Sequence, residues 1–490
     1  MSDFPQALSN LKKFNSLILT NKELGRFFVF GDYNMLQSYQ LPILVDFLSL
    51  DDKKKNSTGL VNKSAEQTAG FLVRTRQLVA IFISMLSYLF LVISRRRILI
   101  FAADKNTFPA YQCDFRMVNL FRYLFDKKIK FVEFFHTIFR EDFTVSAIKR
   151  HRPAIYLEAI DVIYKLLSNL GFYKKEIKPL IDSIDLTLAG DEALFFRELL
   201  MKYANLTSQS LFRVRFMRNL LKFTGVKILI AAADTRNYNE LVAACNVLGI
   251  ETYGFQSGNL TKYDVGYLDC CGSKGRLMKP GKMIVESGYW KNELLRLGTY
   301  FKEDEIEIGG NMKEDYFMEA ELTGGDDKKN NGLTVLIPYE IAAPKNEILE
   351  YIKKLLSCPN VRVVFKFRAD RDLVEQALEY GLKDISGNLV LITDIKEIEN
   401  FDIVAGTYST FLYEMIGKLK PAVIFKTSLD YGEGMVINKL ADEIDIKDND
   451  FCGKLREIGG TSANILTARR NKLYGDYVPL ASTLNKMLKL

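Results

Sequence analysis

Two hydroxyl residues and one carboxylate stand close together in the stretch AGTYSTFLYEMIGKLKPAVIF, residues 405–425. Ser409 and Thr410 follow a short apolar run, and Glu414 comes one turn later on an expected helix. The first amide groups of such a helix carry partial positive charge, so with the two hydroxyls they could bind a phosphate. Glu414 could then accept hydrogen bonds from ribose hydroxyls. An ordinary helix cap, with a Glu that balances the helix dipole, explains the same residues without any ligand.

Two carboxylates in the first half of the chain also follow predicted strands. Asp234 ends the run KILIAAAD and lies two residues before Arg236, and Glu158 follows PAIYL. A carboxylate at the end of an apolar strand either caps a helix or faces a ligand. In the second case it could act as a base for an acceptor hydroxyl or as a nucleophile. Both interpretations are open for Asp234 and for Glu158.

The elements that must position these residues alternate regularly between strand and helix. Apolar runs and helical periodicity predict strands at 331–340, 360–368, 388–394, 402–406 and 421–425, with helices at 344–356, 370–381, 395–401 and 410–420. Further strands are predicted at 95–104 and 152–161, and a strand–helix–strand unit at 225–259. Short connections in strict alternation are typical of parallel sheets.

This pattern predicts an α/β fold with two Rossmann-like parallel-sheet domains that face a central cleft. We place the first domain at 1–300 and the second at 301–490, and the last helix of the second could pack back on the first. Ligands of open α/β sheets bind beyond the carboxyl ends of the strands, so residues there are the candidates for function.

Composition narrows the possible ligands. The 490 residues carry a net charge of +7, which suits an anionic ligand or an acidic membrane surface but is weak evidence for nucleic acid. Six Cys without CxxC spacing and two His make a zinc site improbable, and we expect buried, reduced thiols. The acidic run at 448–450 is interpreted as a solvated loop. We therefore expect no metal and no cofactor.

One uncharged segment, QLVAIFISMLSYLFLVIS at 77–94, has arginines on both sides, at 74 and 76 and at 95–97. Its length is near the lower limit for a bilayer span. Three interpretations are open, namely a buried helix, a helix in the membrane interface with an arginine collar, and a full span.

The stretch STFLYEMIGKLKPAVIF resembles the nucleotide-binding segment of GT-B glycosyltransferases, above all of those that build bacterial surface polysaccharides. The resemblance implies that Ser409 and Thr410 lie near the donor phosphate and Glu414 near the ribose or base. EIEIGGNMKEDYF is similar to the Gly–Asn segment of these enzymes, which implies that Gly310 and Asn311 face the cleft.

Two further stretches match the family only in part. VRVVFKFRADRD stands where sialyltransferase-like and Kdo-transferase-like members carry Lys-x-His-Pro, so Lys366 is retained while Arg368 replaces the His. Arg368 can bind a phosphate but cannot act as a neutral base. GFQSGN resembles the turn Tyr-Gly-x-Gln-His-Gly of the same enzymes, with Gln256 retained and Ser257 in place of His.

The resemblance implies transfer of Kdo or a related ulosonic acid from its CMP donor to a glycan or lipid-linked glycan. On the pattern of retaining β-Kdo transferases, Asp234 attacks the anomeric carbon, CMP leaves towards Arg368 and the two hydroxyls, and Glu158 assists the acceptor. Arg236 is a further donor-binding candidate. The expected location is the cytoplasm, with peripheral contact to the inner membrane.

Two alternatives stay open. The first is an inverting GT-B enzyme that uses a CMP-sialic-like acid, a UDP- or GDP-sugar, or CDP-glycerol. The second is an inactive scaffold that binds a nucleotide without turnover.

Overall fold

The computed structural model describes most of the chain, namely residues 4–30, 33–48, 64–104, 107–108, 110–137, 152–170, 178–184, 190–232, 238–269, 276–313, 332–340, 343–368, 372–382, 388–398 and 400–489. The chain forms two compact units. The first consists of Met1–Ser257, Asp264–Ile284 and Gly298–Glu307, and the second of Gly258–Tyr263, Val285–Leu297 and Ile308–Leu490. The two units interleave in sequence, and each is described by itself.

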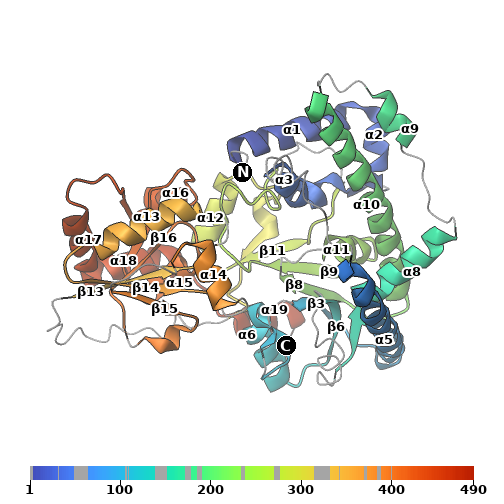
Figure 1. Cartoon of the computed structure of the whole chain (residues 1–490). Coiled ribbons are helices and arrows are strands. Elements are labelled where there is room, and N and C mark those ends of the chain that lie inside the picture. Colours follow the sequence, from blue (N-terminus) through green and yellow to red (C-terminus); the bar gives the residue numbers. More distant parts are fainter. Residues whose placement is uncertain are drawn as a thin grey trace. The chain divides into compact units, whose positions relative to one another are not determined.

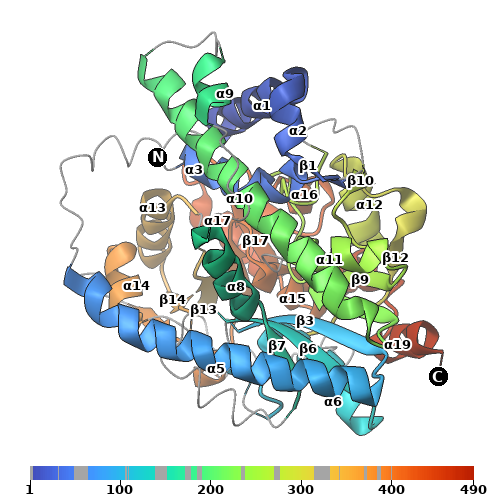
Figure 2. The same cartoon turned by 90° about the vertical axis from the view of Figure 1, so that its right-hand side faces the viewer.

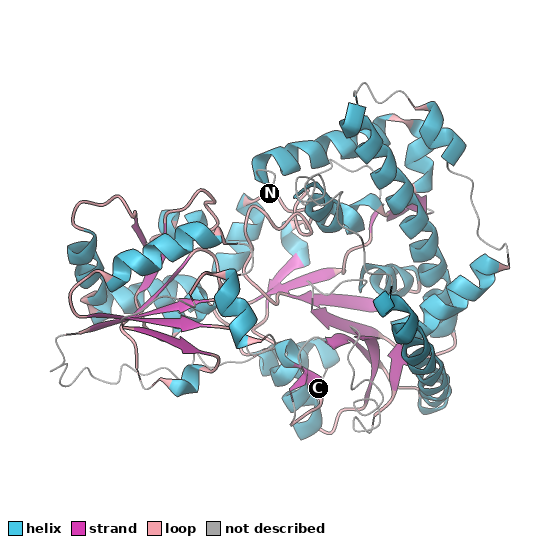
Figure 3. Ribbon diagram, in the orientation of Figure 1, coloured by secondary structure: helices cyan, strands magenta, loops and turns pink. Residues whose placement is uncertain are grey.

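The second unit is built on a six-stranded sheet with the order β15-β14-β13-β16-β17-β18, shown in magenta in Figure 3. All its strand pairs are parallel. Numbered along the chain this is the order 3-2-1-4-5-6 of a Rossmann sheet. The strands are β13 (Leu333–Pro338), β14 (Val361–Lys366), β15 (Leu389–Ile392), β16 (Ile403–Gly406), β17 (Ala422–Phe425) and β18 (Asp442–Ile444). The first five confirm the predicted strands.

Helices cover both faces of this sheet (Figures 1 and 3). The helices of the second unit are α12 (Gly288–Arg296), α13 (Lys345–Leu356), α14 (Leu373–Glu379), α15 (Thr410–Gly417), α16 (Glu433–Ile437), α17 (Phe451–Gly459), α18 (Ala463–Tyr474) and α19 (Leu480–Leu488). The core between them is aliphatic and aromatic, as in Val363, Phe365 and Ile352. The acidic run at 448–450 lies just before α17, where the Asp450 carboxylate accepts the N–H of Gly453 and caps the helix.

Cys358 and Cys452 form a disulfide, so the expectation of reduced thiols is wrong for this pair. Cys358 follows α13 and Cys452 lies in α17, with their Cα atoms 5.7 Å apart. The two cysteines are 94 positions apart in sequence, so local sequence patterns do not predict that they are neighbours. Cys113 and Cys245, in the first unit, are buried and form no disulfide within the described residues.

The first unit contains a seven-stranded sheet with the order β12-β11-β9-β8-β3-β6-β7. The pairs from β11 to β7 are all parallel. The strands are β3 (Ile98–Asp104), β6 (Phe131–Thr137), β7 (Ala154–Tyr156), β8 (Ile228–Ala232), β9 (Glu251–Phe255), β11 (Lys282–Val285) and β12 (Ile306–Ile308). The predicted fold class, with two Rossmann-like parallel sheets, is confirmed.

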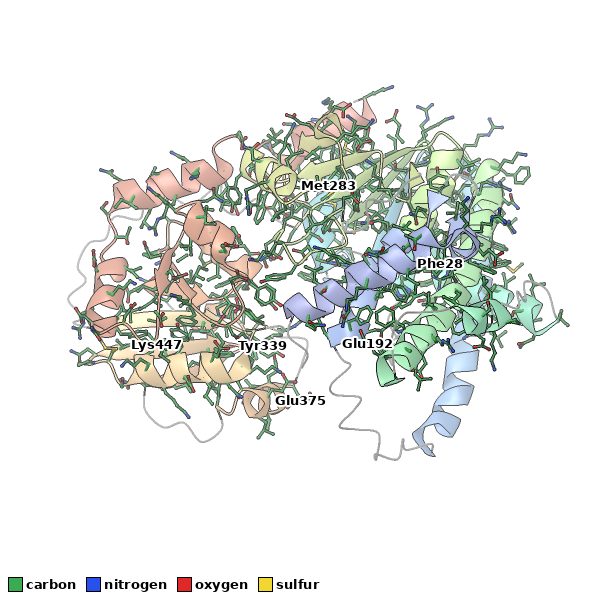
Figure 4. The ribbon with its side chains drawn as sticks, turned by 90° about the horizontal axis from the view of Figure 1, so that it is seen from above. Phe28, Glu192, Met283, Tyr339, Glu375 and Lys447 are labelled. Carbon is green, nitrogen blue, oxygen red and sulfur yellow. A yellow bond between two sulfur atoms is a disulfide. The ribbon has the colours of Figure 1, made fainter. Side chains whose placement is uncertain are left out.

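Helices of the first unit pack on this sheet and form a separate helical layer. They are α1 (Phe4–Thr20), α2 (Lys22–Phe27), α3 (Gln40–Leu48), α5 (Ser64–Ser94), α6 (Val118–Asp126), α8 (Leu157–Asn169), α9 (Lys178–Ser183), α10 (Gly190–Lys222) and α11 (Tyr238–Val247). Phe14, Phe47, Phe196 and Tyr203 join α1, α3 and α10 through ring contacts. Phe28, labelled in Figure 4, is buried nearby.

Short strands complete the first unit. Strand β1 (Val29–Phe30) pairs antiparallel with β2 (Tyr33–Asn34), which also pairs parallel with β10 (Arg276–Leu277). Strand β4 (Thr107–Phe108) pairs antiparallel with β5 (Cys113–Asp114).

The uncharged segment 77–94 forms the second half of α5, which runs along the outside of the first unit beside β6 and β7 (Figure 2). Its side chains are divided between a buried and an exposed face. Within the residues that the structure describes, no helix combines the length and the apolar character needed to cross a membrane.

Candidate functional site

The strand order of the second unit reverses between β13 and β16, which are neighbours in the sheet although α13, β14, α14 and β15 separate them in sequence. Chains leaving the two strands turn to opposite faces, and such a switch point is where open α/β sheets bind ligands. Tyr339, labelled in Figure 4, and Glu340 follow β13. Thr407, Tyr408 and Ser409 follow β16.

The Glu340 carboxylate accepts four donors from the segment after β16. The N–H groups of Thr407, Tyr408 and Ser409 donate to it over 2.8, 2.8 and 2.6 Å, and the Thr407 hydroxyl donates over 2.6 Å. Convergent backbone N–H groups ahead of a helix are a typical anion site. Here the protein supplies the anion itself, from a residue with 4% of its surface exposed.

Two neighbours make this contact specific. A Cβ added to Gly406 would lie 2.9 Å from Oε1 of Glu340, so no larger residue fits there without a shift. The Tyr380 hydroxyl donates to the Glu340 carbonyl over 2.6 Å and fixes its main chain. Burial raises the pKa of Glu340, and the hydrogen bonds from Thr407, Tyr408 and Ser409 oppose that shift. The segment after β16 is thus held in one conformation by a single buried side chain.

Ser409 and Thr410, the predicted phosphate ligands, stand directly after this contact. Ser409 caps α15, because its Oγ accepts the N–H of Phe411 over 3.2 Å. Its own N–H is engaged by Glu340, which leaves its hydroxyl hydrogen to donate elsewhere. Neither the N–H nor the hydroxyl of the half-buried Thr410 makes a hydrogen bond within the described part of the chain. Thr410 therefore offers two donors at the start of α15.

Lys366, at the carboxyl end of β14, supplies positive charge beside α15. Its Nζ lies 5.7 Å from the ring centroid of Phe411, in the first turn of that helix. Burial lowers the pKa of Lys366, and the negative charge of Glu414 opposes the shift. Its ammonium makes no ion pair within the described residues. A half-buried cation next to open helix donors is suited to an anionic ligand.

Arg368, two residues further on, is fixed through its main chain. The buried Gln376 accepts the Arg368 N–H at Oε1 and donates from Nε2 to the Arg368 carbonyl, both over 3.0 Å. This amide clamp continues the direction of β14 beyond its last strand residue. Arg368 and Lys366 therefore project from one rigid segment.

A second group of polar residues joins α15 to the segments after β11 and β12. Lys313 Nζ pairs with Oε1 of Glu414 over 2.7 Å. The Lys313 N–H donates to Oδ1 of Asn311 over 2.6 Å, and Asn311 Nδ2 donates to Oε1 of Glu286 over 2.7 Å. The predicted residues Glu414 and Asn311 thus belong to one chain of contacts that also contains Lys313 and Glu286.

Glu286 is the most perturbed acid of this group. Burial and the nearby charge of Glu414 raise its pKa to about 8, although Lys313 opposes the shift. At neutral pH the side chain therefore holds a proton, and a protonated carboxylic acid can donate to a ligand. The site thus contains both a cation, Lys366, and a proton donor.

The raised pKa of Glu286 predicts a pH-dependent stability. The folded chain keeps a proton that the unfolded chain, with its usual pKa of 4.5, releases. The contribution of Glu286 to the free energy of unfolding is therefore fully present below pH 4.5 and is lost as the pH rises through about 8. We expect a lower free energy of unfolding at pH 9 than at pH 6, and a smaller difference in Glu286→Gln. Urea unfolding at both pH values measures this, with the exposed Glu443→Gln as control, and an unchanged difference in Glu286→Gln would contradict it.

Gly310 has a structural constraint of its own. Its φ is +78°, and an added Cβ would lie 2.5 Å from the carbonyl oxygen of Val478 and 2.6 Å from the N atom of Leu480. Its neighbour Asn311 donates its N–H to the Tyr477 hydroxyl over 3.3 Å. Gly310 therefore lets the segment before α19 pack against the loop that carries Asn311 and Lys313.

The predicted residues of the first unit fall into three situations. Gln256 is buried and donates its N–H to the Ile284 carbonyl over 2.8 Å. The Ser257 Oγ is buried and has no hydrogen-bond partner within the described residues. Asp234 and Arg236 lie outside the described residues.

Glu158 lies in the first turn of α8, and its Oε1 is 2.9 Å from Nδ1 of His136 in β6. Arg213 of α10 holds α8 in place through two 2.7 Å hydrogen bonds to Asp161. A carboxylate next to an imidazole orients the ring and can support a general base. The structure thus places the His136 imidazole beside Glu158 at the carboxyl end of the sheet, although the geometry of the two groups forms no hydrogen bond.

Sequence reasoning missed four residues of these clusters. Glu340 and Glu286 each end an apolar strand run, so the rule that selected Asp234 could have selected them too. Lys313 lies in the Gly–Asn segment EIEIGGNMKEDYF, but its position in that segment gave no indication of a contact with Glu414. His136 was counted only as one of two histidines, because its partner is 22 residues away.

The sequence matches no protein-family model and no curated protein. Similar solved structures include the UDP-GlcNAc 2-epimerase from Neisseria meningitidis bound to UDP-GlcNAc, with 12% identity over 80% of this chain and 98% of that one and a TM-score of 0.47. The Methanocaldococcus jannaschii UDP-GlcNAc 2-epimerase, in complex with UDP-GlcNAc and UDP, is 11% identical over 80% and 99% (TM-score 0.46). A calicheamicin glycosyltransferase is 9% identical over 80% and 98% (TM-score 0.45). Because the sequence identities and TM-scores are this low, these structures assign no chemistry to the chain. The fold class is inferred from the strand orders of the two sheets.

Proposed function

We propose that the chain is a GT-B glycosyltransferase that moves Kdo or a related ulosonic acid from its CMP donor onto a bacterial surface glycan, either lipopolysaccharide or capsule. The observation that carries the proposal is the half-buried Lys366 beside the open donors of Thr410, at the switch point of a Rossmann sheet. A departing nucleotide phosphate needs such a cation and such donors.

The charge of the donor fits the site. A CMP-ulosonic acid carries one phosphate and one carboxylate, so side-chain cations and helix donors can neutralise it without a divalent metal. Lys366, Arg368, Thr410 and the Ser409 hydroxyl are the proposed ligands of these groups. Glu414 is the proposed ligand of the ribose or base, and its pair with Lys313 fixes its position.

The acceptor side of the reaction involves the first unit. Asp234 is proposed as the nucleophile on the anomeric carbon, and Glu158 as the group that assists the acceptor hydroxyl. The 2.9 Å contact with His136 supports the role of Glu158 in proton transfer. Arg236, Gln256 and Ser257 are proposed donor contacts, and the proposed location is the cytoplasmic face of the inner membrane. Two alternatives are an inverting enzyme for another nucleotide sugar and an inactive scaffold. Both would use the second unit in the same way, so the second unit does not distinguish them from the proposed enzyme.

Incubation with a panel of donors tests the function. CMP-Kdo, CMP-sialic acid, UDP-GlcNAc, GDP-mannose and CDP-glycerol are supplied separately, with and without EDTA, and free nucleotide is measured. We expect release of CMP from CMP-Kdo that EDTA leaves unchanged. Release from another donor alone would replace the proposed substrate, and binding without release would favour the scaffold.

The proposed nucleophile needs its own measurement. Intact mass spectrometry after a brief exposure to CMP-Kdo is expected to show the protein with one added sugar. The adduct should be absent in Asp234→Asn and present in Asp269→Asn, an exposed control in the same unit. An adduct of equal yield in Asp234→Asn would exclude that residue as the nucleophile.

A further inference from the structure

The second half of α5 presents its large apolar side chains to the outside. Side chains are described from residue 78 onward, and exposed fractions are 67% for Leu78, 63% for Phe82, 61% for Met85, 52% for Leu86, 55% for Leu89, 42% for Phe90 and 81% for Ile93. At 3.6 residues per turn these seven positions fall within about 140° of the helix circumference. We call them the apolar stripe.

The opposite side of α5 carries mainly small or hydroxyl-bearing side chains. Ala80, Ser84, Ser87 and Leu91 are buried there. Ser84 Oγ accepts the N–H of Tyr156 over 2.8 Å, and Ser87 Oγ accepts the N–H of Ala154 over 3.0 Å. The helix thereby covers β7, the edge strand of the seven-stranded sheet, which would otherwise expose unpaired backbone groups.

This arrangement inverts the usual surface helix, which buries its large apolar residues and exposes polar ones. Small residues and serine hydroxyls at the protein side, with Leu, Phe and Ile outward, are typical of helices whose outer surroundings are lipid. In Figure 2 the stripe-bearing half of α5 lies on the outside of the unit. A contiguous apolar face of this kind marks an interaction site.

Basic residues gather where α5 ends. Arg95 and Arg97 are exposed, and the parallel register of β6, β3 and β8 brings the residues that precede these strands to the same sheet edge. The Arg97 carbonyl accepts the N–H of Lys227 over 2.8 Å, and Arg96 Nη1 donates to the Phe131 carbonyl over 2.5 Å. The exposed cations of this basic edge are Arg95, Arg97, Lys127, Lys128, Lys130, Lys222 and Lys227. In the described segments 95–97, 125–130, 222–227 and 251, the acidic residues are Asp126 and Glu251.

Exposed aromatic residues stand among these cations. Phe223 is 66% exposed next to Lys222, and Phe125 is 42% exposed two residues before Lys127. Arg96 lies over the Phe90 ring of the apolar stripe, with 4.6 Å from Cζ to the ring centroid. Stripe and basic edge are therefore continuous through the Phe90–Arg96 contact.

We propose that the apolar stripe and the basic edge together bind the surface of a bilayer that contains anionic lipids. In this arrangement α5 lies in the plane of the interface, with the stripe among the acyl chains and the cations at the headgroups. A second copy of the chain fits less well, because a symmetric contact would bring two basic edges together. The surface lies outside the candidate functional site, so the inference does not depend on the proposed function.

Vesicle flotation of the full chain tests the inference. Phosphatidylcholine vesicles with and without 30% phosphatidylglycerol are mixed with protein at low and high salt. A stripe variant carries Phe82→Gln, Leu89→Gln and Ile93→Gln, and an edge variant carries Lys127→Glu, Lys222→Glu and Lys227→Glu. The matched control carries Val374→Gln, Leu378→Gln and Ile437→Gln, which are apolar residues of the second unit that are 55%, 56% and 60% exposed.

We expect the wild type and the control to float with the anionic vesicles. The stripe variant should lose at least tenfold in vesicle affinity at either salt concentration. The edge variant should lose at least tenfold at low salt, where each cation near the surface contributes most. Light scattering of the same samples reports the oligomeric state. Equal flotation of the wild type, the stripe variant and the edge variant overturns the proposal. It is also overturned if the wild type is a dimer, the stripe variant is a monomer, and neither of the two binds vesicles.

Discussion

Replacing Lys366 by Met is expected to lower the rate of donor cleavage at least about 100-fold, the usual loss when one preorganised charge or donor is removed from a leaving group. Met keeps the apolar stem beside Phe411 but removes the ammonium. Because burial already lowers the pKa of Lys366, the folded chain carries the cost of partial desolvation. The free energy of unfolding should therefore stay equal or rise slightly while activity falls.

This opposite behaviour of activity and stability distinguishes a ligand-binding cation from a structural one. Single-turnover nucleotide release and urea unfolding are measured on the same preparations. Lys353→Met, at an exposed position of α13, is the control and should leave both unchanged. If Lys366→Met releases nucleotide within threefold of the wild type, Lys366 does not bind the leaving phosphate. If it loses stability and activity together, its role is structural.

The parts of the second unit that could be predicted from sequence are those that local pattern specifies. Each predicted strand between 331 and 425 is a short apolar run between polar turns, and each contains a strand of the sheet. The cap at Ser409 is likewise local, because its partner Phe411 is two residues away. Such contacts need no knowledge of the fold.

The contacts that define the candidate site are not local. Glu340 and Thr407 are 67 residues apart, and Lys313 and Glu414 are 101 residues apart. Glu340 and Thr407 meet only because β13 pairs with β16 and skips β14 and β15, a strand order that no periodicity reveals. The stretch around Ser409 therefore predicted an anion site but not that a carboxylate of the same chain occupies its amide groups.

Replacing Glu340 by Ala is expected to lower the free energy of unfolding of the second unit by about 3 kcal/mol or more. The change leaves the buried N–H and hydroxyl of Thr407 and the partly buried N–H groups of Tyr408 and Ser409 without their acceptor, and each unsatisfied buried group costs about 1–3 kcal/mol. Entry of water into the vacated space limits the sum. Glu340→Gln keeps one acceptor oxygen but turns an amide towards donors, so its loss should be intermediate. Urea unfolding measures the series, with Glu350→Ala on the exposed face of α13 as control.

An added anion should reverse part of this loss, and only in the variant. In Glu340→Ala the N–H groups of Thr407, Tyr408 and Ser409 are free to bind sulfate or phosphate, whereas in the wild type the carboxylate fills that position. An anion that binds only the folded form raises its stability with concentration. Sulfate should therefore stabilise Glu340→Ala more than the wild type and more than Glu350→Ala, after correction for chloride at equal ionic strength. Equal stabilisation of all three would show that these amide groups do not form an anion site, and Ser409 would then be a helix cap alone.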